Sequence, residues 1–151
     1  MDSAGMLPDD QHQLLNRIAA LHHRSLPTYL TYAKPWVPTG KEDEALVIDD
    51  IAADHHDLVE RVLHELEKDD RPVHLGDFPM DYTDLNDLSL SFILNEIKIY
   101  ERNLLATLEE LVQWADKDGP VYRLTNIAIG MTVGHLQNLE EMGNQSPSIH
   151  S

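Results

Sequence analysis

Four residues whose side chains can bind metals or carry protons lie at the centres of apolar helical stripes: His22, His55, Glu101 and His135. At about 100° per residue, each one falls among aliphatic residues that share a single face of its predicted helix. A polar side chain on such a face costs stability unless it is hydrogen-bonded, paired with a charge or bound to a metal. The four residues therefore predict a single polar layer in the protein core.

Three imidazoles and one carboxylate can hold one divalent ion. This donor set suits Zn²⁺ in tetrahedral geometry, and it suits Fe²⁺, Mn²⁺ or Ni²⁺ when water completes the coordination shell. The chain has no cysteine, so any metal site must use His, Asp and Glu. The alternative is a metal-free layer in which Glu101 holds a neighbouring imidazole protonated and fixes the register of the helices. The residue pattern leaves both alternatives open and indicates no substrate, reaction or catalytic residue.

Helical periodicity dominates the chain and strand-like alternation is nearly absent, so we predict an all-α fold. Four helices are expected, at about residues 8–33, 42–69, 84–117 and 120–142. Pro27 lies inside the first helix and should kink or split it. Residues 143–151 are expected to form a flexible tail, and the whole chain, residues 1–151, is expected to fold as one domain.

The connections between the predicted helices are short, long and short. Short loops make consecutive helices antiparallel, so the first two helices should form one hairpin and the last two another. The connection at residues 70–83 can reach roughly 45 Å at about 3.3 Å per residue, whereas a helix of about 27 residues is roughly 40 Å long. This connection can therefore cross the full length of a helical bundle.

Two hairpins joined by a long crossover, with polar residues at matched depth, resemble the ferritin-like superfamily, the bacterioferritin and rubrerythrin kind of four-helix bundle. The resemblance covers roughly residues 10 to 142. In that family two helices each give a single Glu and two give Glu-x-x-His, and together these residues hold two metal ions. Glu101 is similar to the single Glu of the third helix, and His55 and His135 are similar to the histidines of the two Glu-x-x-His motifs.

The sequence departs from the family pattern at three positions. Ala52 and Thr132 stand where the two motifs have their Glu, and His22 replaces the Glu of the first helix. The missing carboxylates are those that would bridge two ions. The resemblance therefore implies a ferritin-like bundle with a degenerate site for at most one ion, and neither a di-iron oxidase centre nor an iron store.

The charge of the chain restricts its partners. There are 27 Asp and Glu against 11 Lys and Arg, which gives a formal net charge of -16. This charge repels phosphate backbones and anionic lipids, so we expect neither nucleic acid nor a membrane as a partner. The N-terminus has no signal-like pattern and no stretch approaches 18 uncharged apolar residues, so we expect a cytoplasmic protein.

Other polar and aromatic residues are assigned supporting roles. His23 and His56 lie at the edges of the apolar stripes and are expected to face solvent or an interface. Tyr29 and Tyr100 can flank the polar layer and hydrogen-bond to it. The loop around Trp36 and the segment 78–82 carry aromatics that either plug the bundle or form a contact in the expected homo-oligomer, for instance a dimer.

Two functions thus remain open. One is a ferritin-like metalloprotein that binds a single divalent ion in its core. The other is a non-catalytic interaction or structural protein whose buried polar layer holds no metal.

Overall fold

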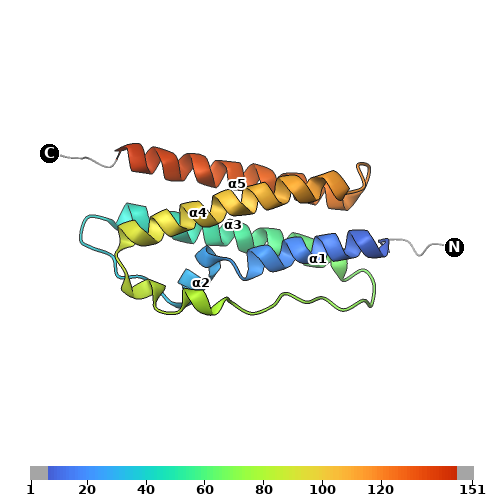
Figure 1. Ribbon diagram of the computed structural model, residues 1–151, viewed down its shortest axis with the longest axis horizontal. Coiled ribbons are helices and arrows are strands. Elements are labelled where there is room, and N and C mark those ends of the chain that lie inside the picture. The colour runs from blue at the N-terminus through green and yellow to red at the C-terminus, as the bar shows by residue number, and fades with distance from the viewer. Residues whose placement is uncertain (1–6, 146–151) are drawn as a thin grey trace.

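The computed structural model describes residues 7–145, with the side chains of residues 7–143, and Figure 1 shows a stack of long helices. No strand occurs within residues 7–145, so the predicted all-α class is confirmed. Short 3-10 turns lie at Met80–Tyr82, Leu85–Asp87 and Val112–Trp114. The α-helices are α1 (Asp9–His23), α2 (Leu26–Tyr32), α3 (Glu42–Leu66), α4 (Leu90–Leu111) and α5 (Pro120–Gln145).

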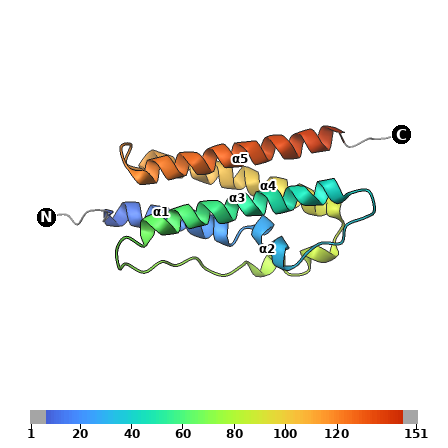
Figure 2. The same cartoon turned by 180° about the vertical axis from the view of Figure 1, so that it is seen from behind.

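The helices form two antiparallel pairs. α1 packs on α3 and α4 packs on α5, and α3 also contacts α5 across the interior. The connection at residues 67–89 runs along the length of the helices from the end of α3 to the start of α4, so α3 and α4 point the same way (Figures 1 and 2). The connections are therefore short, long and short, as the sequence predicts.

The first predicted helix, residues 8–33, is wrong as one element because it is two helices. α1 ends at His23, and α2 begins at Leu26 after the cap residue Ser25. The Ser25 hydroxyl accepts a hydrogen bond from the Thr28 backbone N–H at 3.3 Å, and Pro27 lies in the first turn, where its missing N–H costs nothing. The expected split at Pro27 is thus confirmed.

The third predicted helix begins later and ends earlier than residues 84–117. Asp84 has a left-handed backbone with φ of 73°, which a continuing helix cannot contain, and Ser89 caps α4 by accepting from the Phe92 N–H at 3.2 Å. The second helix ends at Leu66 rather than at residue 69. α5 continues through residues 143–145, which were predicted to be tail, and the rest of that tail lies outside the described residues.

The core consists of two apolar clusters with the polar layer between them. One cluster is centred on Leu15, Ile18, Leu58, Val62 and Leu108, and the other on Leu30, Ile51, Ile93, Ile97 and Leu139. On α3 and α4, the residues of the two clusters come from opposite sides of His55 and Glu101 along the sequence. The packing of both clusters therefore holds the polar layer at a fixed depth.

The long connection is attached to α1. The Asn16 side chain donates to the His74 carbonyl at 2.7 Å and accepts from the His74 N–H at 2.8 Å. Farther along, Gly76 lies against the Arg24 guanidinium and has φ of 79°, a left-handed backbone that favours glycine. These contacts position the segment that follows, which lies over α2.

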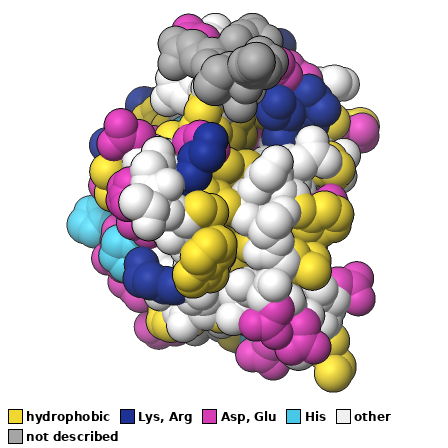
Figure 3. Space-filling model, turned by 90° about the vertical axis from the view of Figure 1, so that its left-hand side faces the viewer, with side chains coloured by type: hydrophobic (Ala, Val, Ile, Leu, Met, Phe, Trp, Pro, Cys, Tyr) yellow, Lys and Arg dark blue, Asp and Glu magenta, His cyan; other side chains and the backbone are white. Residues whose placement is uncertain are grey.

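The surface carries both acidic and hydrophobic side chains. Figure 3, which views the end where α3 and α4 begin, shows acidic groups around exposed hydrophobic ones. Trp36 is 73 % exposed, whereas the Phe78 and Tyr82 rings contact Tyr29 at centroid distances of 5.3 and 5.5 Å, so the second predicted aromatic segment covers α2. None of the helices in the described part of the chain is apolar over a length that could cross a membrane.

Candidate metal centre

The four predicted site residues are all buried. His22 is 2 % exposed, His55 1 %, Glu101 0 % and His135 5 %. They come from four different helices, α1, α3, α4 and α5, because each lies on the apolar stripe that its helix turns toward the interior. The structure thus places them in one core layer.

Three of these residues form a group with the spacing of metal ligands. The Nδ1–H of His135 donates to Glu101 Oε1 at 2.9 Å, and the Nε2 of His55 lies 3.2 Å from Glu101 Oε2. One candidate ligand atom from each of these residues lies within 4.8 Å of the other two. The Glu101 carboxylate therefore sits between two imidazoles, with one oxygen directed at each.

The contact between His55 and Glu101 is close but is not a good hydrogen bond. Although Nε2 and Oε2 are 3.2 Å apart, no hydrogen bond joins them, and both atoms are buried without another hydrogen-bond partner among the described residues. A short distance alone does not make a hydrogen bond, because the bond weakens steeply when it is bent. Buried polar atoms that face each other without a hydrogen bond require an explanation, and a shared ion is one.

The outer nitrogen of each imidazole in this group is already bonded. The Nδ1 of His55 shares a hydrogen bond of 2.7 Å with the hydroxyl of Ser25, and the Nε2–H of His135 donates to Asp54 Oδ2 at 2.7 Å. Such contacts orient the rings and fix which nitrogen faces inward. Asp54 has a half-exposed side chain, so the layer reaches solvent on its side of α3.

The contacts of the layer set its charges. Burial of Glu101 opposes ionisation, but hydrogen bonding from His135 and the contact with His55 outweigh it and lower its pKa to about 2. Burial likewise opposes the charged form of His135, yet its bonds to Glu101 and Asp54 raise its pKa. In the absence of a metal, His135 is thus an imidazolium held between two carboxylates.

His22 lies beside the group but outside it. Its Nδ1–H donates to the Ile18 carbonyl one turn earlier on α1 at 2.8 Å. Its ring meets that of His55 edge to face, with centroids 4.9 Å apart. Burial and the neighbouring His55 lower the pKa of His22 to about 3, so its ring is neutral.

The positions that depart from the ferritin-like pattern hold no carboxylate in the structure either. Ala52 and Thr132 are buried, and the Thr132 hydroxyl donates to the Ala128 carbonyl at 2.8 Å. Among the described residues, the group of His55, Glu101 and His135 is the only set of three or more potential ligands at metal-binding spacing. The layer thus has donors for one ion.

The sequence also predicts positions for two further histidines and roles for two tyrosines, and the structure agrees only for the histidines. His23 and His56 are exposed, as predicted. Tyr100 is half-buried, and its hydroxyl donates to the Leu21 carbonyl at 2.6 Å rather than to the polar layer. Tyr29 packs on aromatic rings. Neither tyrosine therefore supports the site by the hydrogen bond that the sequence suggested.

Two residues of the site were missed from the sequence. Ser25 bonds to His55 and Asp54 to His135, and neither is among the residues predicted for the site. The signal available was the Ser-x-Pro start of α2, which predicts a cap at Ser25. No sequence pattern indicates that the same hydroxyl reaches His55.

Comparisons of the chain with protein-family models, with curated proteins and with solved structures give no significant match.

The double role of Ser25 leads to a stability prediction. Ser25→Ala and Ser89→Ala each remove a helix cap, which costs about 1 kcal/mol. Ser25→Ala should cost about 1 to 2 kcal/mol more than Ser89→Ala, because it also leaves the buried His55 ring without its hydrogen-bond partner. Urea unfolding of both variants in a chelator measures the difference. Equal losses would show that the hydrogen bond between Ser25 and His55 contributes no stability.

Proposed function

We propose that this chain is a ferritin-like metalloprotein that binds one divalent first-row metal ion through His55, Glu101 and His135. The two antiparallel helix pairs and the long crossover between them support the ferritin-like assignment. The donor set differs from the sequence-based one in omitting His22, whose Nδ1 is bonded to its own helix.

The observation that carries this proposal is the unsatisfied contact at the centre of the layer. Nε2 of His55 and Oε2 of Glu101 face each other at 3.2 Å without a hydrogen bond, while the outer nitrogens of both imidazoles are bonded to Ser25 and Asp54. An ion between the inner atoms would complete the arrangement of ligands and outer hydrogen bonds found in protein metal sites.

Two histidines and one carboxylate leave coordination positions open. This donor set occurs in catalytic zinc sites and in non-haem Fe²⁺ sites, and it leaves room for water or a small ligand. A bound ion would supply Lewis acidity at that position. The protein would supply a buried, rigid set of ligands between two apolar clusters.

Binding should release protons. A metal can replace the proton on Nδ1 of His135, while the Nε2–H of the same ring continues to donate to the Asp54 carboxylate. His55 binds through Nε2 when its N–H lies on Nδ1, directed at the Ser25 hydroxyl. We therefore expect at least about one proton released per ion from His135 near neutral pH.

The alternative is a metal-free polar layer that fixes helix register. The contact that favours it is the pairing of His135 with both Glu101 and Asp54, at 2.9 and 2.7 Å, which already compensates the buried charges. This alternative predicts a non-catalytic structural or interaction protein.

Metal titration of untagged, metal-free protein separates the two functions. At least one of the metals Zn²⁺, Fe²⁺, Mn²⁺ and Ni²⁺ should bind, and its stoichiometry should not exceed one ion per chain. At about 100 times the dissociation constant it should raise the thermal midpoint by roughly 5 to 10 °C. His135→Ala should lose this shift, whereas the exposed His64→Ala on α3 should keep it. A parent protein that responds to none of these ions supports the metal-free layer, and two ions bound in the core would contradict the one-ion site.

A further inference from the structure

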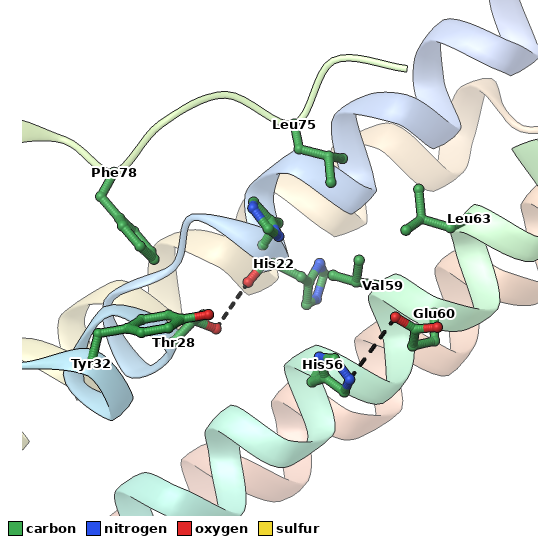
Figure 4. Close-up of a pocket in the computed structure, with 10 residues that line it drawn as sticks. His22, Thr28, Tyr32, His56, Val59, Glu60, Leu63, Leu75 and Phe78 are labelled. Carbon is green, nitrogen blue, oxygen red and sulfur yellow. Dashed lines mark hydrogen bonds and ion pairs between the residues drawn. The ribbon is translucent and has the colours of Figure 1, made fainter. Parts of the chain in front are cut away.

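A cavity of about 330 Å³ lies beside His22, and none of the three candidate metal ligands is among its described lining residues. Its walls come from α1, α2, α3 and the long connection, and Figure 4 shows these side chains around a common space. The volume is at the lower end of the range for small-molecule sites in proteins. The cavity is therefore large enough for a compact organic molecule.

The walls of this cavity are largely aromatic and aliphatic. Tyr32 and Phe78 stand with ring centroids 6.0 Å apart, and Leu63 and Leu75 also line the space. Among its described lining residues none is Lys or Arg. The exposed polar residues at the wall are His23, His56 and Glu60, and Nε2 of His56 lies 3.9 Å from the Glu60 carboxylate. Together with the net charge of the chain, this lining disfavours anions and suits a neutral apolar ring.

One buried polar group marks a preferred orientation in the cavity. His22 lines it while only 2 % exposed, and because its Nδ1–H donates to Ile18, the other ring nitrogen, Nε2, is a hydrogen-bond acceptor. The nearby Thr28 hydroxyl donates to the His22 carbonyl at 3.2 Å. The polar group best suited to meet this wall is therefore an O–H or N–H donor.

The wall formed by the long connection is held in place without a ligand. The paired hydrogen bonds between Asn16 and His74 lie next to Leu75, and Gly76 sits against Arg24. A wall that is already ordered does not have to lose conformational freedom when a ligand binds.

We propose that this cavity binds a small neutral aromatic molecule with one hydroxyl or N–H donor, the phenol class, with the donor on His22. The site is formed by residues other than the three proposed metal ligands, so it does not depend on the proposed function. Nevertheless, the ring of His22 also contacts His55, so the cavity and the polar layer share a wall.

Phenol, toluene and benzoate are suitable probes, titrated into the protein with and without Zn²⁺ and followed by backbone NMR shifts. Phenol should bind with a dissociation constant of about 1 mM, the affinity expected for so few atoms. Toluene should bind about fivefold to tenfold more weakly because it lacks the donor. Benzoate should bind least of the three.

Variants locate the binding. Leu75→Trp should fill the cavity and abolish phenol binding, whereas Leu46→Trp, an exposed position on α3, should leave it unchanged. His22→Phe should make phenol and toluene bind alike. Tyr32→Ala removes an exposed wall residue, is not expected to disturb folding, and should weaken phenol about threefold or more.

The proposal is overturned if phenol does not bind at about ten times the expected dissociation constant, or if neither Leu75→Trp nor Tyr32→Ala weakens it. Equal binding of phenol and toluene by the parent would overturn the role of His22, and tighter binding of benzoate would overturn the neutral ligand class. Phenol binding without Zn²⁺ binding would leave this site standing and reject only the metal centre.

Discussion

Glu101→Gln is expected to weaken metal binding by more than about 100-fold and to destabilise the metal-free protein by about 3 to 5 kcal/mol. The carboxylate is fully buried, contacts both His55 and His135, and has a pKa of about 2. The amide removes the charge that compensates the His135 imidazolium. It also replaces the only anionic ligand of the proposed set with a neutral amide, whose oxygen is a weaker donor to a divalent ion.

Urea unfolding in a chelator and zinc titration measure the two effects separately. Glu109→Gln, on the exposed side of α4, removes the same charge from the same helix and should change neither quantity appreciably. If Glu101→Gln behaved like Glu109→Gln, neither the metal centre nor the buried ion pair could be as described.

Replacing the pair with leucines distinguishes stability from function. Glu101→Leu combined with His135→Leu should recover most of the stability that Glu101→Gln loses, since apolar replacement of a buried pair is often neutral or better. Asp54 is half-exposed and can return to solvent. The double variant should nevertheless bind no ion. A double variant less stable than Glu101→Gln would mean that the layer contributes stability that leucine packing cannot supply.

His22→Phe is expected to remove a large part of the acid sensitivity of the metal-free protein. The pKa of His22 falls from its ordinary 6.5 to about 3 on burial, so the unfolded chain binds a proton that the folded protein does not. The stability associated with neutral His22 is complete above pH 6.5 and is lost as the pH falls toward 3. The loss is about 1.4 kcal/mol per pH unit.

The window from pH 6.5 to 4.5 isolates this effect. The raised pKa of His135 makes its contribution complete below pH 6.5, and that contribution is lost only at higher pH. The contribution of Glu101 is complete above pH 4.5 and is lost as the pH falls through about 2. Over this window the parent should therefore lose about 2 kcal/mol more than His22→Phe, because the full slope is reached only below pH 6.5.

Urea unfolding at several pH values in a chelator tests this slope. His23→Phe changes the exposed neighbour on α1 and should retain the slope of the parent protein. Parallel pH profiles for the parent and His22→Phe would show that His22 is not held neutral in the folded state.

The helical class, the buried layer and the break near Pro27 could all be predicted from the amino-acid sequence. These features depend on local patterns: the period of apolar residues along a helix, and a proline whose missing N–H interrupts one. His22, His55, Glu101 and His135 could be placed in the core because each occupies the centre of an apolar stripe, a property of a single helix.

Helix ends were less predictable where the chain offered competing signals. Asp84 and Ser89 can both cap a helix, and the structure uses Ser89 because Asp84 takes a left-handed conformation within the long connection. A helix start at either residue would satisfy the local capping rules. The left-handed backbone at Asp84 and the packing of Leu85 on the second apolar cluster favour the later start.

Which polar residues contact one another depends on how the helices pack. Residues adjacent in a helix point about 100° apart, so Asp54 and His55 can both contribute only because α3 packs between α1 and α5. The cap hydroxyl of Ser25 meets His55 because the chain breaks at that depth, and the His22 ring nitrogen bonds to its own helix instead of joining the ligand group. Such contacts depend on the rotation and axial offset of one helix against another, which side chains distant in sequence set together and no local pattern encodes.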